Sequence, residues 1–183
     1  MPDTTTPAAA AAQPDPADLA AFKAGFRRHA AGVAIVTARD ADGRPVGFTA
    51  TSLASLAAVP PLATFNMART ASSWRAIEET DRVVVHLLGL RNQGLARRMA
   101  GPAAERFEGD HWSEGPHGLP LLHDVTAWMT GRIVERVHVH GNAVVVVQVE
   151  DGGTGADDDA LLYHDRRWLR PVHLEAKTKR TST

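Results

Sequence analysis

The sequence predicts a mainly β protein, in which an antiparallel barrel carries a few short helices packed on its outside. About six or seven segments have the length and apolar content of strands, and short turns typical of hairpins link several of them. The predicted helices are few and short, which argues against a doubly wound parallel sheet. No G-x-G-x-x-G follows the first strand, so a Rossmann-type dinucleotide site is not expected.

The chain divides into a tail, a domain and a second tail. Residues 1–17 are Pro, Thr and Ala with almost no large apolar side chain, so we expect a disordered N-terminal tail. Residues 18–172 form the predicted domain, and residues 173–183 a polar C-terminal tail. Asp18 is a plausible N-cap for an amphipathic helix that extends to about Ala30.

Strands and short helices then alternate with loops. A strand at Val33–Ala38, a turn at Asp40–Gly43 and a returning strand at Arg44–Leu53 form a predicted hairpin. Further strands are expected at Leu62–Met67, Arg82–Leu88, 127–136, 143–149, Leu161–His164 and Arg167–Leu169. Short helices are expected at Trp74–Glu79 and Gln93–Ala100. Residues 101–120 read as one long, Gly- and Pro-rich loop, and such loops are often functional.

Composition excludes several classes of function. The net charge of -1 gives no reason to expect nucleic acid or an anionic membrane as a partner. The chain has no cysteine, so disulfides, thiolate metal ligands and cysteine nucleophiles are excluded. No apolar stretch is long enough to span a membrane, and no signal peptide is evident, so a cytoplasmic protein is expected.

The segment Gly47–Trp74 holds an unusual density of hydroxyl side chains. Hydroxyls and exposed backbone N–H groups suit a phosphate-bearing cofactor, because they donate hydrogen bonds and take little space. Arg69 adds a positive charge suited to bidentate contact with phosphate. The alternative is a set of strands and loops that merely happens to be rich in Ser and Thr.

A series of motifs surrounds this segment in a definite order: GVAIVT at 32–37, GFTATS at 47–52, PPL at 60–62, RTASSW at 69–74, ERF at 105–107, GLPLL at 118–122, LLY at 161–163 and RRW at 166–168. Their order and spacing resemble the short-chain flavin reductases, the FMN- or FAD-using reductase components of two-component flavin monooxygenases. The resemblance covers about residues 22–171. It implies a Greek-key split β-barrel of the FMN-binding flavin-reductase type, usually a homodimer with flavin near the subunit interface.

The resemblance also implies two groups of site residues. On the flavin side they are Thr49, Ala50, Thr51, Ser52 and Ser55 near the ring and ribityl chain, Asn66, Arg69, Thr70 and Ser72 around the phosphate, and His86 on the following strand. On the nicotinamide side they are Arg106 and Phe107 from the long loop, with His140 and Asn142. No residue is predicted to be catalytic, because the two cofactors react directly with one another.

The chain departs from the family pattern at Gly141-Asn142, where the family often has Asp-His facing the nicotinamide. Asparagine can hydrogen-bond a carboxamide but cannot carry a proton charge. Ala57 and Val59 replace a Ser and an Asp that usually precede the double proline. These departures make nicotinamide binding less secure than flavin binding.

Two other patterns contain residue types that can bind metal ions. His138 and His140 lie two apart, on one face of a predicted strand, at a spacing that metals use, but no helical histidine motif accompanies them. The acidic run Asp157–Asp159 lacks the alternating oxygen ligands of an EF-hand loop. No metal is predicted.

The function expected from the resemblance is NAD(P)H-dependent reduction of FMN or FAD, with reduced flavin supplied to a partner monooxygenase. The sequence leaves open FMN against FAD, and NADH against NADPH. The alternative is a flavin- or heme-binding protein on the same barrel without reductase activity. A weaker possibility is an oxidase that retains its flavin, as in the related pyridoxamine-phosphate oxidase barrels.

Overall fold

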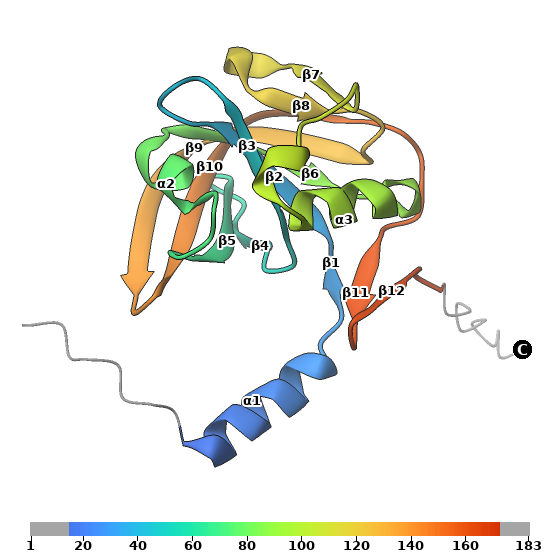
Figure 1. Cartoon of the computed structure of the whole chain (residues 1–183). Helices are drawn as coiled ribbons and strands as arrows, with labels where there is room; N and C mark the ends of the chain where they lie inside the picture. The colour runs from blue at the N-terminus through green and yellow to red at the C-terminus, as the bar shows by residue number, and fades with distance from the viewer. Residues whose placement is uncertain (1–14, 173–183) are drawn as a thin grey trace, which may run out of the picture.

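The computed structural model describes residues 15–172, and the predicted tails lie largely outside them. One antiparallel sheet of seven strands forms most of the molecule (Figure 1). Its strands, in spatial order, are β3 (Pro45–Ala50), β2 (Ala34–Arg39), β6 (Arg82–Leu87), β9 (Ala127–Val139), β10 (Asn142–Thr154), β5 (Leu62–Ala68) and β4 (Ala54–Ala57).

The sheet curls without closing, because its edge strands β3 and β4 are not hydrogen-bonded to each other. Phe48 of β3 nevertheless packs on Phe65 of β5, with ring centroids 5.8 Å apart. The inner face of the sheet therefore encloses a core, in which Val36, Val85 and Val145 are fully or almost fully buried. The prediction of a mainly β, split-barrel-like fold with peripheral helices is confirmed.

Two smaller sheets and several helices complete the structure. β1 (Ala31–Gly32), β11 (Leu162–His164) and β12 (Arg167–Leu169) form one sheet, and β7 (Trp112–Glu114) pairs with β8 (Pro120–Leu122). The helices are α1 (Pro16–Arg27), α2 (Trp74–Glu79) and α3 (Gln93–Ala100), with short 3-10 turns at Leu90–Asn92, Ala103–Glu105 and Pro116–Gly118. No helix within residues 15–172 has the length and apolar content needed to cross a membrane.

Alternation along β2 explains why the sheet is covered on both faces. Val36 points into the inner core, whereas Ile35 points to a second core on the outer face. That outer core also contains Met99 of α3 and Leu122 of β8, both buried. Because successive strand side chains point to opposite faces, a continuously buried run such as Ala34–Ala38 requires cover on both sides.

Helix α1 lies apart from the body of the protein, below β1 and β11 (Figure 1). It begins at Pro16, and the Asp15 carboxylate accepts a hydrogen bond from the backbone N–H of Ala17. The predicted N-cap at Asp18 was therefore wrong, and so was the predicted end near Ala30. Proline at the first helical position and an aspartate just before it are a common helix start. None of its residues is buried.

The structure confirms the two short helices and the first hairpin turn, and it adds strand residues where loops were predicted. Helices α2 and α3 occupy the predicted residues, and the turn at Asp40–Gly43 links β2 to β3 with Gly43 at φ 78°. β9 and β10 are longer than predicted, so part of the acidic segment after Val149 is strand. The loop predicted at 101–120 instead contains β7 and the start of β8.

Candidate functional site

The hydroxyl-rich segment forms the end of β3, a short loop and the edge strand β4. Ala50 is buried in the inner core, whereas Thr51 and Ser55 are exposed. The sequence did not predict β4, which pairs with β5 through Ser55 and Ala63. An edge strand leaves one row of backbone groups without a partner in the sheet, so this segment presents both hydroxyls and backbone polar groups outward.

Ser52 ties this loop to β5. Its hydroxyl donates to the carbonyl of Asn66 at 3.1 Å and accepts from the backbone N–H of Asn66 at 2.9 Å. Both contacts use the Asn66 backbone, so the exposed Asn66 side chain remains available. These two bonds hold Ser52 next to Asn66, and they require a side chain whose hydroxyl both donates and accepts.

An apolar trough runs beside the exposed hydroxyls. Two adjacent hollows of about 230 and 340 Å³ share Leu53 and Leu87 in their walls. Leu62 and Met129 line the larger hollow, which also reaches Ser55. A planar apolar ring with polar edges would find apolar walls and hydroxyl donors in this one place.

Sequence reasoning missed these apolar wall residues. Leu53 and Leu62 lie within the hydroxyl-rich segment, but the residues predicted from it were its polar residues and Ala50. Leu87 and Met129 come from β6 and β9, which pair side by side in the sheet. Strand pairing, which the sequence does not specify, brings them together.

A second part of the predicted site lies at the far end of β5. The backbone N–H of Arg69 donates to the carbonyl of Gly141 at 2.8 Å, and Asn142 lies opposite Ala68 in the β5–β10 register. His140 occupies the β9–β10 turn with φ 50° and is exposed, as is Asn142. The structure thus brings Arg69, His140 and Asn142 to one edge of the molecule.

The Arg69 side chain is exposed and weakly held. Its guanidinium lies 5.8 Å from the Trp74 ring centroid and 4.0 Å from the Glu78 carboxylate. Both contacts are at the long end of their range, so they constrain the side chain little. Trp74 also packs edge-on against His138, with centroids 5.7 Å apart, which accounts for His138 without a metal.

Thr49 is engaged inside the protein. Its hydroxyl donates to the carbonyl of Ala96 at 2.6 Å and so fastens α3 to β3. A hydroxyl still has acceptor capacity, but its proton is committed to this bond. The side chains of Thr49 and Ala50 are therefore used by the fold, the first to hold α3 and the second in the inner core.

His86 is fully buried, and both of its ring nitrogens form hydrogen bonds within the protein. Its Nδ1 lies 3.2 Å from the carbonyl oxygen of Ile35, and its Nε2 accepts from the backbone N–H of Leu122 at 3.1 Å. Since Nε2 accepts, the proton is on Nδ1. Burial lowers the pKa of His86 to about 4, although the bond to Ile35 acts in the opposite direction. The ring joins β2, β6 and β8 and does not line the trough.

Arg106 is likewise held by internal contacts. Nη1 donates to the carbonyl of Gly47 at 2.8 Å and to the Ser73 hydroxyl at 3.0 Å, while Nε and Nη2 donate to the carbonyl of Gly101. Desolvation lowers the pKa of Arg106, but a guanidinium stays protonated in proteins. Arg106 thus fastens the long loop to the start of β3.

Phe107 packs beside this anchor. It meets Trp112 edge-on at 5.4 Å, and a methyl group at Gly47 would lie 3.1 Å from its ring. Arg106 bonds to β3, to Ser73 just before α2 and to its own loop, and Phe107 packs on Trp112 and against the outer core. The predicted nicotinamide-side residues therefore fall into two places, since His140 and Asn142 lie at the β9–β10 turn.

The remaining predicted residues, Thr70 and Ser72, are exposed near the start of α2. Ser72 lines a hollow of about 260 Å³ that also includes Arg44, Arg75 and Glu79. In the acidic run Asp157–Asp159, Asp158 accepts hydrogen bonds from the backbone N–H and Nε of Arg91, whereas Asp157 and Asp159 are exposed. Within residues 15–172 no three His, Asp or Glu side chains group as metal ligands.

Comparison with known proteins gives a consistent match. The sequence pattern of the flavin reductase like domain matches residues 26–170. The chain is 39% identical over 158 residues to an NADH:FMN oxidoreductase from Rhodococcus qingshengii, covering 84% of this chain and 82% of that protein.

Solved structures agree. A flavin reductase domain protein from Arthrobacter sp. FB24 superposes with a TM-score of 0.84 at 52% identity, covering 87% of this chain and 99% of the other. A flavin reductase, HpaC, complexed with NADP+ superposes with a TM-score of 0.77 at 28% identity, covering 84% and 97%. The exposed hydroxyl segment, the adjoining trough and the curled sheet thus occur in a chain that belongs to the flavin reductase family.

Proposed function

We propose that this protein is an NADH-dependent flavin reductase that transfers a hydride from the reduced nicotinamide to FMN or FAD. The observation that carries the proposal is the apolar trough at Leu53, lined in part by Ser55 and two residues along the chain from the exposed Thr51, in a member of the flavin reductase family. The similarity to an NADH:FMN oxidoreductase supports both FMN and NADH as substrates.

The residues present suit a flavin. Apolar walls from Leu53, Leu87 and Met129 would take the ring, and the hydroxyls of Thr51 and Ser55 would donate to its polar edge or to the ribityl chain. Asn66 and Arg69, both exposed on or beside β5, are the proposed polar contacts toward the phosphate. Thr70 and Ser72 remain proposed phosphate contacts, and Ser52 a backbone contact.

Flavin supplies the redox chemistry, since it accepts a hydride directly from a reduced nicotinamide. The chain's own task is to hold the two rings in contact and exclude water. His86 is buried and neutral near pH 7, so we assign it no part in proton transfer and leave it out of the proposed ligand contacts. His140 and Asn142 remain proposed nicotinamide contacts, whereas Arg106 and Phe107 support the loop.

The test is NADH and NADPH oxidation by purified protein with FMN, with FAD and without added flavin. We expect turnover that depends on added flavin. A protein that binds flavin stoichiometrically but oxidises neither nicotinamide contradicts the proposal.

A second candidate is a flavin- or heme-binding protein without reductase activity. The observation that favours it is Asn142, which lies exposed at the β9–β10 turn where the family often has a histidine. Restoring the pair with Gly141→Asp and Asn142→His discriminates the two. If the natural protein is an active reductase, this variant gains little. If it is a binding module, the variant acquires turnover.

Two further proposals concern partners. Reduced flavin is proposed to pass to a separate monooxygenase. A homodimer is supported by α1, on which Leu19, Phe22 and Phe26 are 39%, 60% and 61% exposed. Exposed apolar clusters of this kind commonly mark interfaces. Light scattering on purified protein gives the oligomeric state, and a cytoplasmic location stays a prediction.

A further inference from the structure

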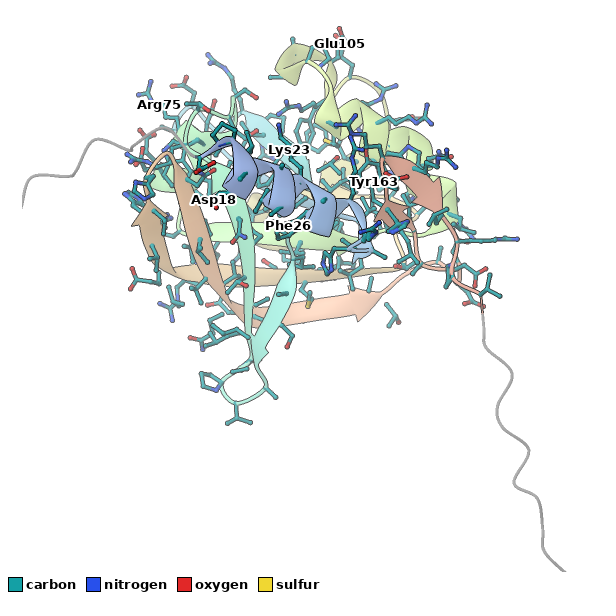
Figure 2. All side chains as sticks on the ribbon, turned by 90° about the horizontal axis from the view of Figure 1, so that it is seen from below. Asp18, Lys23, Phe26, Arg75, Glu105 and Tyr163 are labelled. Atoms are coloured by element: carbon teal, nitrogen blue, oxygen red, sulfur yellow. The ribbon has the colours of Figure 1, made fainter. Side chains whose placement is uncertain are left out.

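A cationic hollow lies between α1 and the β11–β12 turn. It has a volume of about 400 Å³ and is lined by Ala24, Arg27, Arg28, His164 and Asp165. Figure 2 views the molecule from the side of α1, with Lys23 and Phe26 on the helix and Tyr163 of β11 beyond its C-terminal end. The lining thus contains two guanidinium groups, one imidazole and one carboxylate, and none of these groups belongs to the trough described above.

Arg27 and Arg28 line the hollow, and Arg166 and Arg167 lie in and just after the β11–β12 turn. Within the part of the chain that the structure describes, Arg27, Arg28, Arg166 and Arg167 form no ion pair, and all four are exposed. Cations near the end of a helix favour its dipole, which accounts for Arg27 and Arg28 only in part. It does not account for Arg166 in the β11–β12 turn or for Arg167 at the start of β12.

The turn itself is an independent observation. Asp165 and Arg166 have φ values of 45° and 61°, which is the two-residue hairpin geometry that Asn-Gly fits best. Arginine is unfavourable in this left-handed region, because its Cβ crowds the backbone. A strained residue at a turn points to a function, and here the strained pair includes Asp165, which lines the hollow together with Arg27 and Arg28.

The hollow is connected to the trough by two paired strands. Gly32 of β1 pairs with Leu162 of β11, and both Gly32 and Leu161 line the part of the trough that includes Leu53. His164, which lines the hollow, is three residues along from Leu161. At about 3.3 Å per residue this separation is roughly 10 Å.

We propose that this hollow binds the adenosine diphosphate portion of the reduced nicotinamide dinucleotide, whose nicotinamide ring lies against the flavin in the trough. The phosphates would be held by Arg27 and Arg28, which suit phosphate oxygens as bidentate donors. FAD also carries an adenosine diphosphate portion, but one of its two phosphates is the phosphate of FMN, which is assigned above to Asn66 and Arg69. The inference rests on the proposed function, because it assigns the polar end of a substrate of that same reaction.

The first experiment measures binding of ADP alone by calorimetric titration, which requires no turnover. The natural protein is compared with an Arg27→Gln/Arg28→Gln variant and with Ala24→Glu, which adds a carboxylate to the hollow from an exposed helix position. The control is Arg82→Gln/Arg132→Gln, which removes the same charge from the paired strands β6 and β9. Helix content by circular dichroism verifies that each variant is folded.

We expect both hollow variants to weaken ADP binding by about tenfold or more, and the control by less than about twofold. KM values then test the assignment to NADH. In both hollow variants the KM for NADH is expected to rise about tenfold, while the KM values for reduced nicotinamide mononucleotide, FMN and FAD do not change. The value of kcat is unchanged.

Several results overturn the inference: no ADP binding to the natural protein, equal weakening in the control, or weaker ADP binding with every KM unchanged. The last result means that the hollow binds anions unrelated to the reaction. Failure of the proposed function has a different signature, because ADP would still bind in the hollow while no nicotinamide is oxidised with any flavin.

Discussion

Two regions of this protein are rich in polar residues and differ in how those residues are used. Around His86 and Arg106, each nitrogen named above is bonded to the chain itself. Around Thr51, Ser55 and Arg69, side chains are exposed and have at most weak contacts. The first region holds the long loop on the sheet, and the second leaves hydrogen-bonding capacity for a ligand. A polar residue in a site motif is therefore not by itself a ligand contact.

The largest effect on stability is expected from His86→Ala. It removes a fully buried ring and leaves the Ile35 carbonyl and the Leu122 N–H without their partner. We expect a loss of about 3–5 kcal/mol in the free energy of unfolding, measured by urea denaturation. His123→Ala, at an exposed position, is the control. A small stability loss together with a complete loss of flavin binding would reverse the assignment of His86 to the structural region.

The same ring gives a pH dependence. In the folded protein the pKa of His86 is about 4, against 6.5 when unfolded, so between these values the unfolded chain binds more protons. Stability is fully present above about pH 6.5 and falls as the pH decreases toward 4, by up to about 3 kcal/mol. Urea denaturation at a series of pH values measures this slope. A His86→Asn variant is expected to show a shallower one, and an unchanged slope would contradict the attribution.

A smaller loss is expected from Arg106→Met, which keeps the length of the stem but removes the bonds to Gly47, Ser73 and Gly101. The site is partly exposed, so water replaces some of these bonds, and we expect about 1–3 kcal/mol. Arg98→Met, which removes a single bond to the carbonyl of Glu108, is the control. If the nicotinamide KM increases tenfold with no change in stability, Arg106 belongs with the ligand contacts instead.

The smallest effect on stability is expected from Arg69→Gln and Thr51→Val, at about 0.5 kcal/mol or less, because both side chains are exposed. Their effect on binding is larger. Loss of a phosphate or hydroxyl contact is expected to raise the Kd for FMN by about tenfold, measured by fluorescence titration. Arg132→Gln serves as the charge control. An unchanged Kd in both variants removes Arg69 and Thr51 from the proposed site.

The sequence was informative where a pattern has a local cause. Helices α2 and α3 and the β2–β3 hairpin were predicted because helical spacing and an Asp-Gly turn are properties of neighbouring residues. It failed on β4, on the β7–β8 hairpin and on the apolar trough. β4, β7 and β8 are only four, three and three residues long, too short for an alternating pattern to stand out from the loops beside them. The trough depends on pairing between β6 and β9, which are far apart in the sequence, and such pairing leaves no mark in a local window.

For the site, too, the sequence predicted the local segment but not the packing of its residues. Motif order indicated the segment that contains Thr51, Ser52 and Ser55, but could not distinguish exposed residues from engaged ones. His86 and Thr51 are both polar and both lie in or beside a family motif. The difference comes from β8, which packs over the sheet and bonds to the His86 ring, whereas nothing comparable covers the Thr51 hydroxyl.

The order of strands in the sheet has a consequence for synthesis of the chain. β5 pairs with β4 and β10, yet residues 69–141 separate β5 from the start of β10. During translation the edge of β5 that pairs with β10 therefore stays uncovered until most of the protein has been made. Uncovered strand edges invite pairing between nascent chains, and non-local pairing slows folding. The region that carries the proposed flavin contacts is thus among the last to be completed.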